Sequence, residues 1–326
     1  MPDPKLSAVL NMVDDPRAIR RTLAALAAQT ARQHLEVVIV TTKQAAAAID
    51  HAGLETFAGH QIVELETLPT GAAGWAAGVQ VVRSPLVVMC EDHSFPEPNW
   101  AQTLLDAHAR AEYFAVSPQV RNGNPATRAS WANFLLSFLE WYNPPATVEV
   151  DVGAGHNTCY RRETLLKAYG ADLETWLNPE RIMHTHARSQ GRKILLEART
   201  WVEHVNISRT SSYFYMCYAG GRVFGAPRAA NWSLGRRLVY ALLFPLVPFL
   251  RLRRLFGRLN SPQKRREARF WGSLPLIVPG LFCHAFGEAV GYLFGEGGIA
   301  PTYGLYELRR RDYVTPAERA WLLQEG

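Results

Sequence analysis

Apolar and polar residues alternate between two kinds of segment in the N-terminal two thirds of the chain. Short apolar runs rich in β-branched residues predict buried strands. The longer stretches between them, several of them Ala-rich and opened by polar residues, predict helices. The expected strands are residues 6–13, 35–40, 61–66, 85–90 and 113–120. Because consecutive parallel strands need a crossover, usually a helix, this alternation predicts a mostly parallel α/β sheet with flanking helices.

The pattern becomes less regular after the fifth expected strand. Residues 122–150 are rich in aromatic side chains, and 131–142 within them predict a helix. A loop with small residues begins at Gly153 and leads into another expected helix. Residues 178–205 predict a helix that ends at Gly191, followed by strand-like segments.

The fourth expected strand ends in three adjacent ionisable residues, Glu91, Asp92 and His93. Such groups are costly to desolvate unless water, a cation or a partner compensates them. In open parallel sheets, ligands bind beyond the carboxyl ends of the strands. These three residues therefore mark the place where we expect a functional site.

Composition sets limits on the class of protein. With 326 residues, 48% of them hydrophobic, the chain can build one large or two ordinary domains, which excludes dominant disorder. The four cysteines are widely separated and form no CxxC pair, so neither a zinc site nor a disulfide framework is indicated. The N-terminus lacks the pattern of a signal peptide. We expect reduced thiols and a cytosolic catalytic part.

The composition changes beyond about residue 206. The net charge of the chain is +6, but its distribution is uneven: residues 236–269 contain ten basic side chains and a single acid, Glu267. Residues 238–250 are apolar or proline, too few to span a bilayer as a straight helix, and their two prolines would kink it. Residues 270–294 are long enough, but they contain His284, Glu288, two prolines and four glycines.

This region favours a helix in the membrane interface, or a shallow hairpin, over a pair of membrane spans. We expect residues 236–294 to contact an anionic membrane surface, because apolar runs flanked by arginine clusters suit such bilayers. The alternative is a buried helical subdomain with solvated basic residues. Nucleic acid is not an expected partner, because no recognised module or interleaved aromatic pattern accompanies the arginines. The expected domains are residues 1–206 and 207–326.

Residues 5–205 resemble a family 2 glycosyltransferase of the GT-A fold, whose Rossmann-like half binds a nucleotide sugar. The resemblance rests on the predicted sheet and on the acidic strand end, which is followed by Pro96 and by the aromatic Trp100 that opens a helix. It also rests on an acidic residue in the helix that ends at Gly191. In this family a short acidic motif holds a divalent cation, and the later acid acts as base.

The resemblance implies a metal site. Matched by distance to Pro96, Glu91 takes the first acidic position of the motif and His93 the second. Imidazole at the second position favours Mn²⁺ or another transition ion over Mg²⁺. Alternatively, Asp92 is the ligand and His93 contacts phosphate, or the acids merely cap the following helix. His204 matches a family histidine that would complete the cation shell or contact the diphosphate; the alternative is a structural histidine.

The resemblance also implies a catalytic base. Counted back from Gly191, Glu180 falls on the second acid of the family's acidic pair, and Pro179 replaces the first. In an inverting transfer this carboxylate accepts the proton of the attacking acceptor hydroxyl. The competing interpretation is an ordinary acid in the first turn of a helix, favoured there by the helix dipole. His184 and His186, on the same helix, are weaker candidates.

Further positions are implied as contacts to the nucleotide sugar. The family usually places an acid after the second strand to hold the nucleobase, where this chain has Thr41 and Thr42. Arg161 and Arg162 match an Arg-Arg helix start near the sugar, or are surface charges. The implied nucleotide-sugar contacts are Val13, Asp15, Thr41, Asp92 and Asn157.

The expected function is that of an inverting, metal-dependent glycosyltransferase that uses a nucleotide-diphosphate sugar. The expected acceptor is a lipid-linked sugar or a polysaccharide at the cytoplasmic face of the inner or plasma membrane, with peripheral or monotopic attachment. The alternative is a catalytically inactive scaffold of the same fold that binds partners at the membrane. The replacements at Pro179, His93 and Thr41 would then mark a decayed site.

Overall fold

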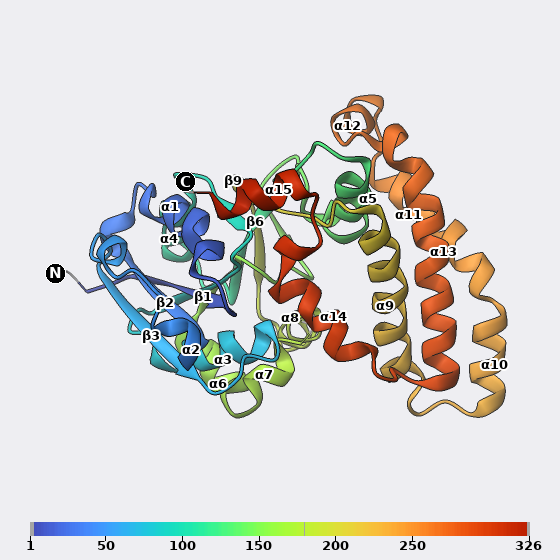
Figure 1. Ribbon diagram of the computed structural model, residues 1–326, viewed down its shortest axis with the longest axis horizontal. Helices are drawn as coiled ribbons and strands as arrows, with labels where there is room; N and C mark the ends of the chain where they lie inside the picture. Colours follow the sequence, from blue (N-terminus) through green and yellow to red (C-terminus); the bar gives the residue numbers. More distant parts are fainter. Residues whose placement is uncertain (1–2, 179, 325–326) are drawn as a thin grey trace. The chain divides into compact units, whose positions relative to one another are not determined.

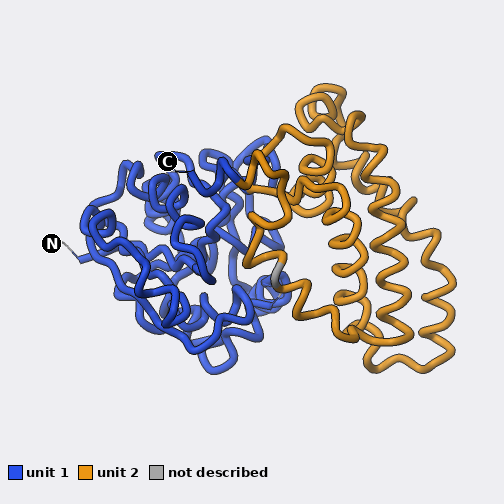
Figure 2. The backbone as a smooth tube through the Cα atoms, in the orientation of Figure 1, with its two compact units in different colours: residues 1–123, 141–204, 320–326 blue, residues 124–140, 205–319 orange. Residues whose placement is uncertain are grey.

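The computed structural model describes residues 3–178 and 180–324. Two compact units make up the chain, coloured blue and orange in Figure 2. The first comprises residues 1–123, 141–204 and 320–326, and the second comprises residues 124–140 and 205–319. The expected boundary at residue 206 lies close to the division after His204. Residues 124–140, however, belong to the second unit, and residues 320–326 belong to the first.

The first unit is built on a nine-stranded sheet with the order β3-β2-β1-β4-β8-β6-β9-β5, and β7 pairs with β9. Every strand of this sheet belongs to the part of the chain that the structure describes. The strands are β1 Leu6–Met12, β2 Leu35–Thr42, β3 Gly59–Leu65, β4 Leu86–Cys90, β5 Ser94–Pro96, β6 Ala115–Asn122, β7 Val148–Val150, β8 Cys159–Arg161 and β9 Ile194–His204.

Most of the sheet is parallel. Strands β1 to β4 pair in parallel, and so do β6 and β9. The short β8 runs antiparallel to both β4 and β6, so β6 keeps the direction of β4. The carboxyl ends of β1, β2, β3, β4, β6 and β9 therefore share one edge of the sheet. The predicted α/β class with a mostly parallel sheet is confirmed.

Helices cover the sheet on two sides, with α1 and α4 on one side and α3, α6 and α7 on the other (Figure 1). The helices of this unit are α1 Arg20–Ala27, α2 Lys43–Ala46, α3 Gly71–Val81, α4 Trp100–Arg110, α6 Arg162–Tyr169, α7 Leu173–Trp176 and α8 Glu180–Ser189. The glycines of α3 serve packing, because a Cβ at Gly78 would lie 3.0 Å from Val40 Cγ2 and closer still to Val9. The α3 backbone thus lies directly on β1 and β2.

The second unit is helical. Its helices are α5 Arg128–Ser137, α9 Thr210–Ala229, α10 Leu234–Leu242, α11 Val247–Arg258, α12 Pro262–Glu267, α13 Phe270–Phe294, α14 Ile299–Leu308 and α15 Pro316–Leu323, the last of which ends in the first unit. The helix expected at 131–142 thus begins and ends earlier in the chain, as α5. The apolar run 238–250 is broken into α10, the 3-10 turn η6 (Phe244–Leu246) and α11. Its prolines stand in the first turns of η6 and α11, where a missing N–H costs nothing.

Helices α9 and α13 cross backbone against backbone. A Cβ at Gly225 would lie 2.6 Å from the Glu288 carbonyl oxygen, and one at Gly291 would lie 2.5 Å from that of Arg222. Gly221 and Gly287 meet the partner helix equally closely. This spacing of glycines four residues apart on both helices lets long helices pack without intervening side chains.

Candidate metal and catalytic site

Two strand pairings bring the ionisable residues together at the carboxyl edge of the sheet. Glu91 directly follows β4, and His204 is the last residue of β9. The antiparallel pairing of β5 with β9 places Ser94 opposite His204. His93 therefore lies beside His204, with ring centroids 4.9 Å apart.

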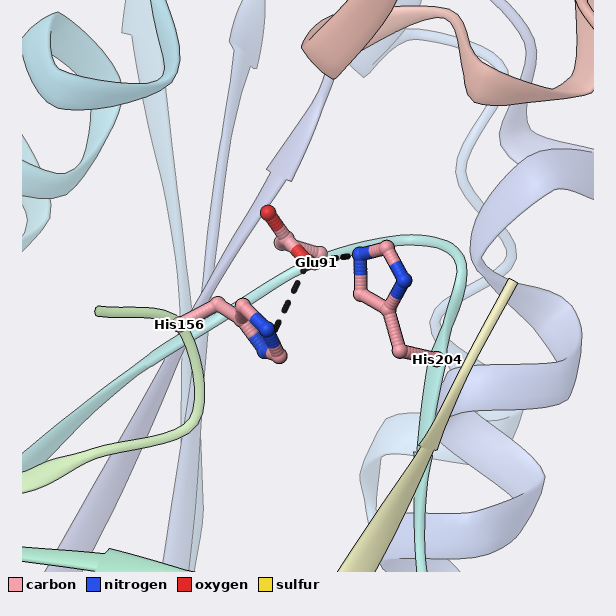
Figure 3. Close-up of side chains that lie close together, drawn as sticks. All are labelled: Glu91, His156 and His204. Carbon is pink, nitrogen blue, oxygen red and sulfur yellow. Dashed lines mark ion pairs between the residues drawn. The ribbon is translucent and has the colours of Figure 1, made fainter. Parts of the chain in front are cut away.

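Glu91 is surrounded by imidazole groups. Its Oε2 atom lies 3.3 Å from His204 Nε2 and 3.7 Å from His156 Nδ1. Figure 3 shows both rings beside this carboxylate, each on a different segment of the chain. Ligand atoms of these three residues all lie within 4.8 Å of one another, a spacing that suits a single metal ion.

His93 is a fourth member of the cluster. Its Nε2 atom lies 3.5 Å from Glu91 Oε2, and its Nδ1 atom is hydrogen-bonded to Asp92 Oδ1 at 2.7 Å. An ionised carboxylate can only accept, so in this hydrogen bond the imidazole nitrogen is the donor. Asp92 thereby orients His93, as carboxylates commonly orient metal-binding histidines.

The cluster fits a divalent cation. Glu91 Oε2 and His93 Nε2 are buried, and neither makes a hydrogen bond to any described residue. These two buried polar atoms lie 3.5 Å apart, and a cation bound beside them would satisfy both. One carboxylate and several imidazoles form a donor set that favours Mn²⁺, Fe²⁺, Co²⁺ or Zn²⁺ over Mg²⁺.

His156 is the cluster residue that the sequence analysis missed. In the antiparallel pair of β4 and β8, Val88 lies opposite Cys159. If this register is continued by three residues beyond each of these positions, Glu91 comes to lie opposite His156. The sequence signal was a histidine next to Asn157 in the small-residue loop. The pairing of β4 with β8, which brings this histidine to Glu91, cannot be predicted from a local pattern.

The candidate base Glu180 reaches the same loop. It begins α8, and its carboxylate packs directly against the backbone of Gly155, next to His156 in the chain. A Cβ at Gly155 would lie 2.6 Å from Glu180 Oε2 and 2.7 Å from Oε1. Pro179, which replaces the family's first acid, lies outside the described residues. A side chain at position 155 would therefore displace the Glu180 carboxylate.

The expected nucleotide contacts lie at the ends of the first two strands. Val13 follows β1, and its carbonyl accepts a hydrogen bond from Thr42 Oγ1 at 3.5 Å. Asp15 caps the next helical turn and pairs with Arg17 at 2.9 Å. Thr41 is fully buried, and its hydroxyl makes no hydrogen bond to a described residue.

Asn157 braces the loop that carries His156. It adopts a left-handed conformation with a φ of 55°, and its backbone N–H donates to the carbonyl of Met89 at 2.7 Å. Its side-chain amide donates to Ser94 Oγ at 2.7 Å and lies 3.1 Å from His156 Nδ1. Asn157 thus ties β4, β5 and His156 together.

The weaker candidates lie in structural contacts. The His186 ring packs against that of Trp176 at a tilt of 34°, with centroids 4.8 Å apart, and Arg161 donates to the carbonyl of His108 at 2.7 Å. Arg162 donates to the carbonyls of Val79 and Gln80. These contacts attach α8 and the start of α6 to their neighbours.

His184 attaches α8 to β8 through the Tyr160 hydroxyl, and its burial predicts a pH effect on stability. It is fully buried, lies 2.8 Å from the Tyr160 hydroxyl, and burial lowers its pKa from 6.5 to about 4. Between these values the unfolded chain takes up a proton and the folded chain does not. We expect the free energy of unfolding to fall by roughly 3 kcal/mol from this group as the pH decreases from 6.5 to 4.

Chemical denaturation at pH 7 and pH 4.5 measures this effect. The variant His184→Asn removes the titration, so it is expected to lose less stability between the two pH values than the parent does. The exposed, non-titrating Gln44 provides a control, because Gln44→Asn is expected to lose as much stability between the two pH values as the parent does. Equal losses in the parent and in His184→Asn would rule out this origin of the acid sensitivity.

No protein-family model and no curated sequence matches this chain. Among solved structures, a similar chain is that of GalNAc-T7 with UDP, GalNAc and Mn²⁺. It is 15% identical at a TM-score of 0.47, and the match covers 62% of this chain but only 44% of that one. A second is S. aureus TarS 1-349 in complex with UDP, 12% identical at a TM-score of 0.43, covering 88% of this chain and 90% of that chain. Both scores lie below 0.5, so neither likeness decides the activity of this chain.

Proposed function

We propose that the first unit is a GT-A glycosyltransferase that moves a sugar from a nucleotide diphosphate to an acceptor hydroxyl, with inversion and with a divalent metal ion. The observation that carries the proposal is the convergence of Glu91, His156 and His204 at one sheet edge, with the Glu180 carboxylate against the adjoining residue of the same loop. The reaction needs a cation that neutralises the departing diphosphate and a carboxylate that accepts the proton of the acceptor hydroxyl, and this arrangement would supply both.

The metal would be held by Glu91, His156 and His204, with His93 beside them. When bound, it would neutralise the diphosphate that departs. Asp92 fixes the orientation of His93, and Asn157 fixes the loop that carries His156. Val13, Asp15 and Thr41, at the ends of the neighbouring strands, are the proposed nucleotide contacts.

Glu180 acts as the general base in this proposal. The acceptor oxygen attacks the anomeric carbon from the face opposite the diphosphate and forms the new C–O bond. The bond between that carbon and the diphosphate oxygen breaks, and the diphosphate leaves with the electron pair. The acceptor proton passes to the Glu180 carboxylate. Attack from the opposite face inverts the anomeric centre.

The acceptor is proposed to be a lipid-linked sugar or a growing polysaccharide at the cytoplasmic face of the membrane. The support is the second unit, whose surface combines exposed apolar side chains with arginines. Peripheral or monotopic attachment would hold the enzyme at the surface where such acceptors are found.

A donor panel tests the proposal. The chain is incubated with UDP-, GDP- and dTDP-sugars and with Mn²⁺, Mg²⁺ or EDTA, and release of the nucleotide is measured. We expect turnover of at least one donor, higher rates with Mn²⁺ than with Mg²⁺, and none with EDTA. Failure to bind or turn over any donor with any ion, in a folded protein, would contradict the proposal.

A further inference from the structure

The second unit exposes an unusual amount of apolar surface within one short stretch. Nine large apolar side chains between residues 234 and 250 are exposed, with Leu242 the most accessible at 77%. They are Leu234, Leu238, Val239, Tyr240, Leu242, Leu243, Leu246, Phe249 and Leu250. Soluble surfaces rarely leave so large an apolar patch without a partner.

Helix α10 presents this surface along one side. Leu234, Leu238 and Leu242 recur every four residues, so they form one exposed stripe, whereas Ala241 is buried. Arg236 lies away from the stripe, with its guanidinium 4.4 Å from the centroid of the Trp232 ring. Helix α10 is therefore amphipathic with its apolar side directed away from the protein core.

Arginines border the apolar stretch. In α11 the first turn exposes Phe249 and Leu250, and the following turns expose Arg253, Arg254 and Arg258. Between residues 236 and 269 ten basic residues accompany one acid. At a bilayer surface, the apolar side chains would contact the acyl chains, and the neighbouring arginines would contact the anionic headgroups.

Helix α13 is held by its neighbours instead. It is the helix, within the described part of the chain, with the length and composition to cross a membrane, yet half of its apolar window is buried. It lies between α9 and α10 (Figure 1). Its Glu288 is buried and accepts hydrogen bonds from Arg251 and, at 3.1 Å, from the Tyr292 hydroxyl. A helix that carries this buried ion pair has a polar, inward side.

We propose that α10, η6 and the first turn of α11 form an in-plane anchor that inserts into the interface of an anionic phospholipid bilayer, while α13 remains a core helix and does not span. This inference deepens the membrane location proposed above, and it is independent of the chemistry at Glu91 and Glu180. A second copy of the chain is a poorer occupant, because two such arginine-bordered faces would repel each other.

Vesicle sedimentation of the full chain tests the anchor. We expect binding to phosphatidylglycerol vesicles, weak binding to phosphatidylcholine vesicles, and loss of binding at high salt. Replacing Leu242 and Phe249 with glutamate is expected to weaken binding at least tenfold, because each side chain loses its transfer into the bilayer. Arg253→Gln and Arg254→Gln are each expected to weaken it about fivefold on anionic vesicles.

Two controls isolate the contribution of the anchor to vesicle binding. Ile182→Glu replaces an exposed apolar side chain of the first unit, 55% accessible, and is expected to leave binding unchanged. The anchor variants are expected to keep the parent's donor turnover in solution. A failure of the membrane-anchor proposal can therefore be distinguished from a failure of the proposed enzymatic function.

Three results would overturn the inference. The first is unchanged vesicle binding in the doubly substituted Leu242/Phe249 variant. The second is a protein that stays in the membrane pellet after alkaline carbonate, which would show a spanning segment. The third is a lipid-free dimer by analytical ultracentrifugation that the same two substitutions dissociate, which would assign the face to a second copy.

Discussion

Glu180→Gln is expected to reduce the rate of glycosyl transfer by roughly 10²- to 10⁴-fold, the usual contribution of a general base. The amide keeps the size of the side chain but cannot accept the acceptor proton. Binding of Mn²⁺ and of the nucleotide is expected to persist, because Glu180 is not one of the three clustered ligands. Single-turnover transfer, measured beside titration of Mn²⁺, checks both parts.

A pair of glycine variants provides a matched control for Glu180. Gly155→Ala adds a methyl group where the carboxylate lies, so it is expected to displace Glu180 and to lower the transfer rate. Gly170→Ala adds the same group at a site where the nearest atoms, in Leu166, are 3.8 Å away, and it is expected to be nearly neutral. Activity of Glu180→Gln within tenfold of the parent would exclude this residue as the base. No turnover in the parent, together with intact cellular function of Glu180→Gln, would support the inactive scaffold.

Glu91→Gln is expected to abolish Mn²⁺ binding at micromolar concentrations and, with it, turnover of the donor. Glu91 supplies the one carboxylate of the cluster, and its Oε2 atom lies within 3.7 Å of three imidazoles. An amide oxygen there would leave the cation with neutral ligands only. Isothermal titration and the electron paramagnetic resonance signal of free Mn²⁺ measure the loss.

Histidine variants identify which imidazoles hold the ion. His156→Ala is expected to weaken Mn²⁺ binding by roughly 10- to 100-fold, whereas His60→Ala, on β3, is expected to have no effect. Parent-like Mn²⁺ affinity in His156→Ala would remove this residue from the site and leave Glu91, His93 and His204, the set implied by the sequence. Parent-like affinity in Glu91→Gln would exclude the cluster as the metal site.

Much of the sheet is predictable because its signals are local. Buried parallel strands are continuous apolar runs, and the first four expected strands correspond to β1, β2, β3 and β4 with end shifts of one or two residues. The position of Glu91 beyond a strand end follows from the same pattern. Helix α5 is shorter than its pattern suggests, because an aromatic run does not by itself show where a helix stops.

The C-terminal region is also predictable only in part. Its sequence shows the arginines, the apolar runs and the prolines that break them. The sequence does not show which of the two apolar segments, 238–250 or 270–294, faces outward. Packing decides it, because the glycines of α9 and α13 hold α13 against α9, whereas the stripe of α10 is exposed.

Local sequence is enough to predict the strand-and-helix alternation, the ionisable strand end at residues 91–93 and the basic, apolar C-terminal region. It does not predict that His156 faces Glu91, that Asp92 orients His93, or that the carboxylate of Glu180 packs on Gly155, all of which depend on the folded sheet. The physical reason is distance along the chain. An antiparallel strand of three residues, such as β8, is too short for its sequence to predict which strand it pairs with. Its register with β4 is set when the whole sheet assembles.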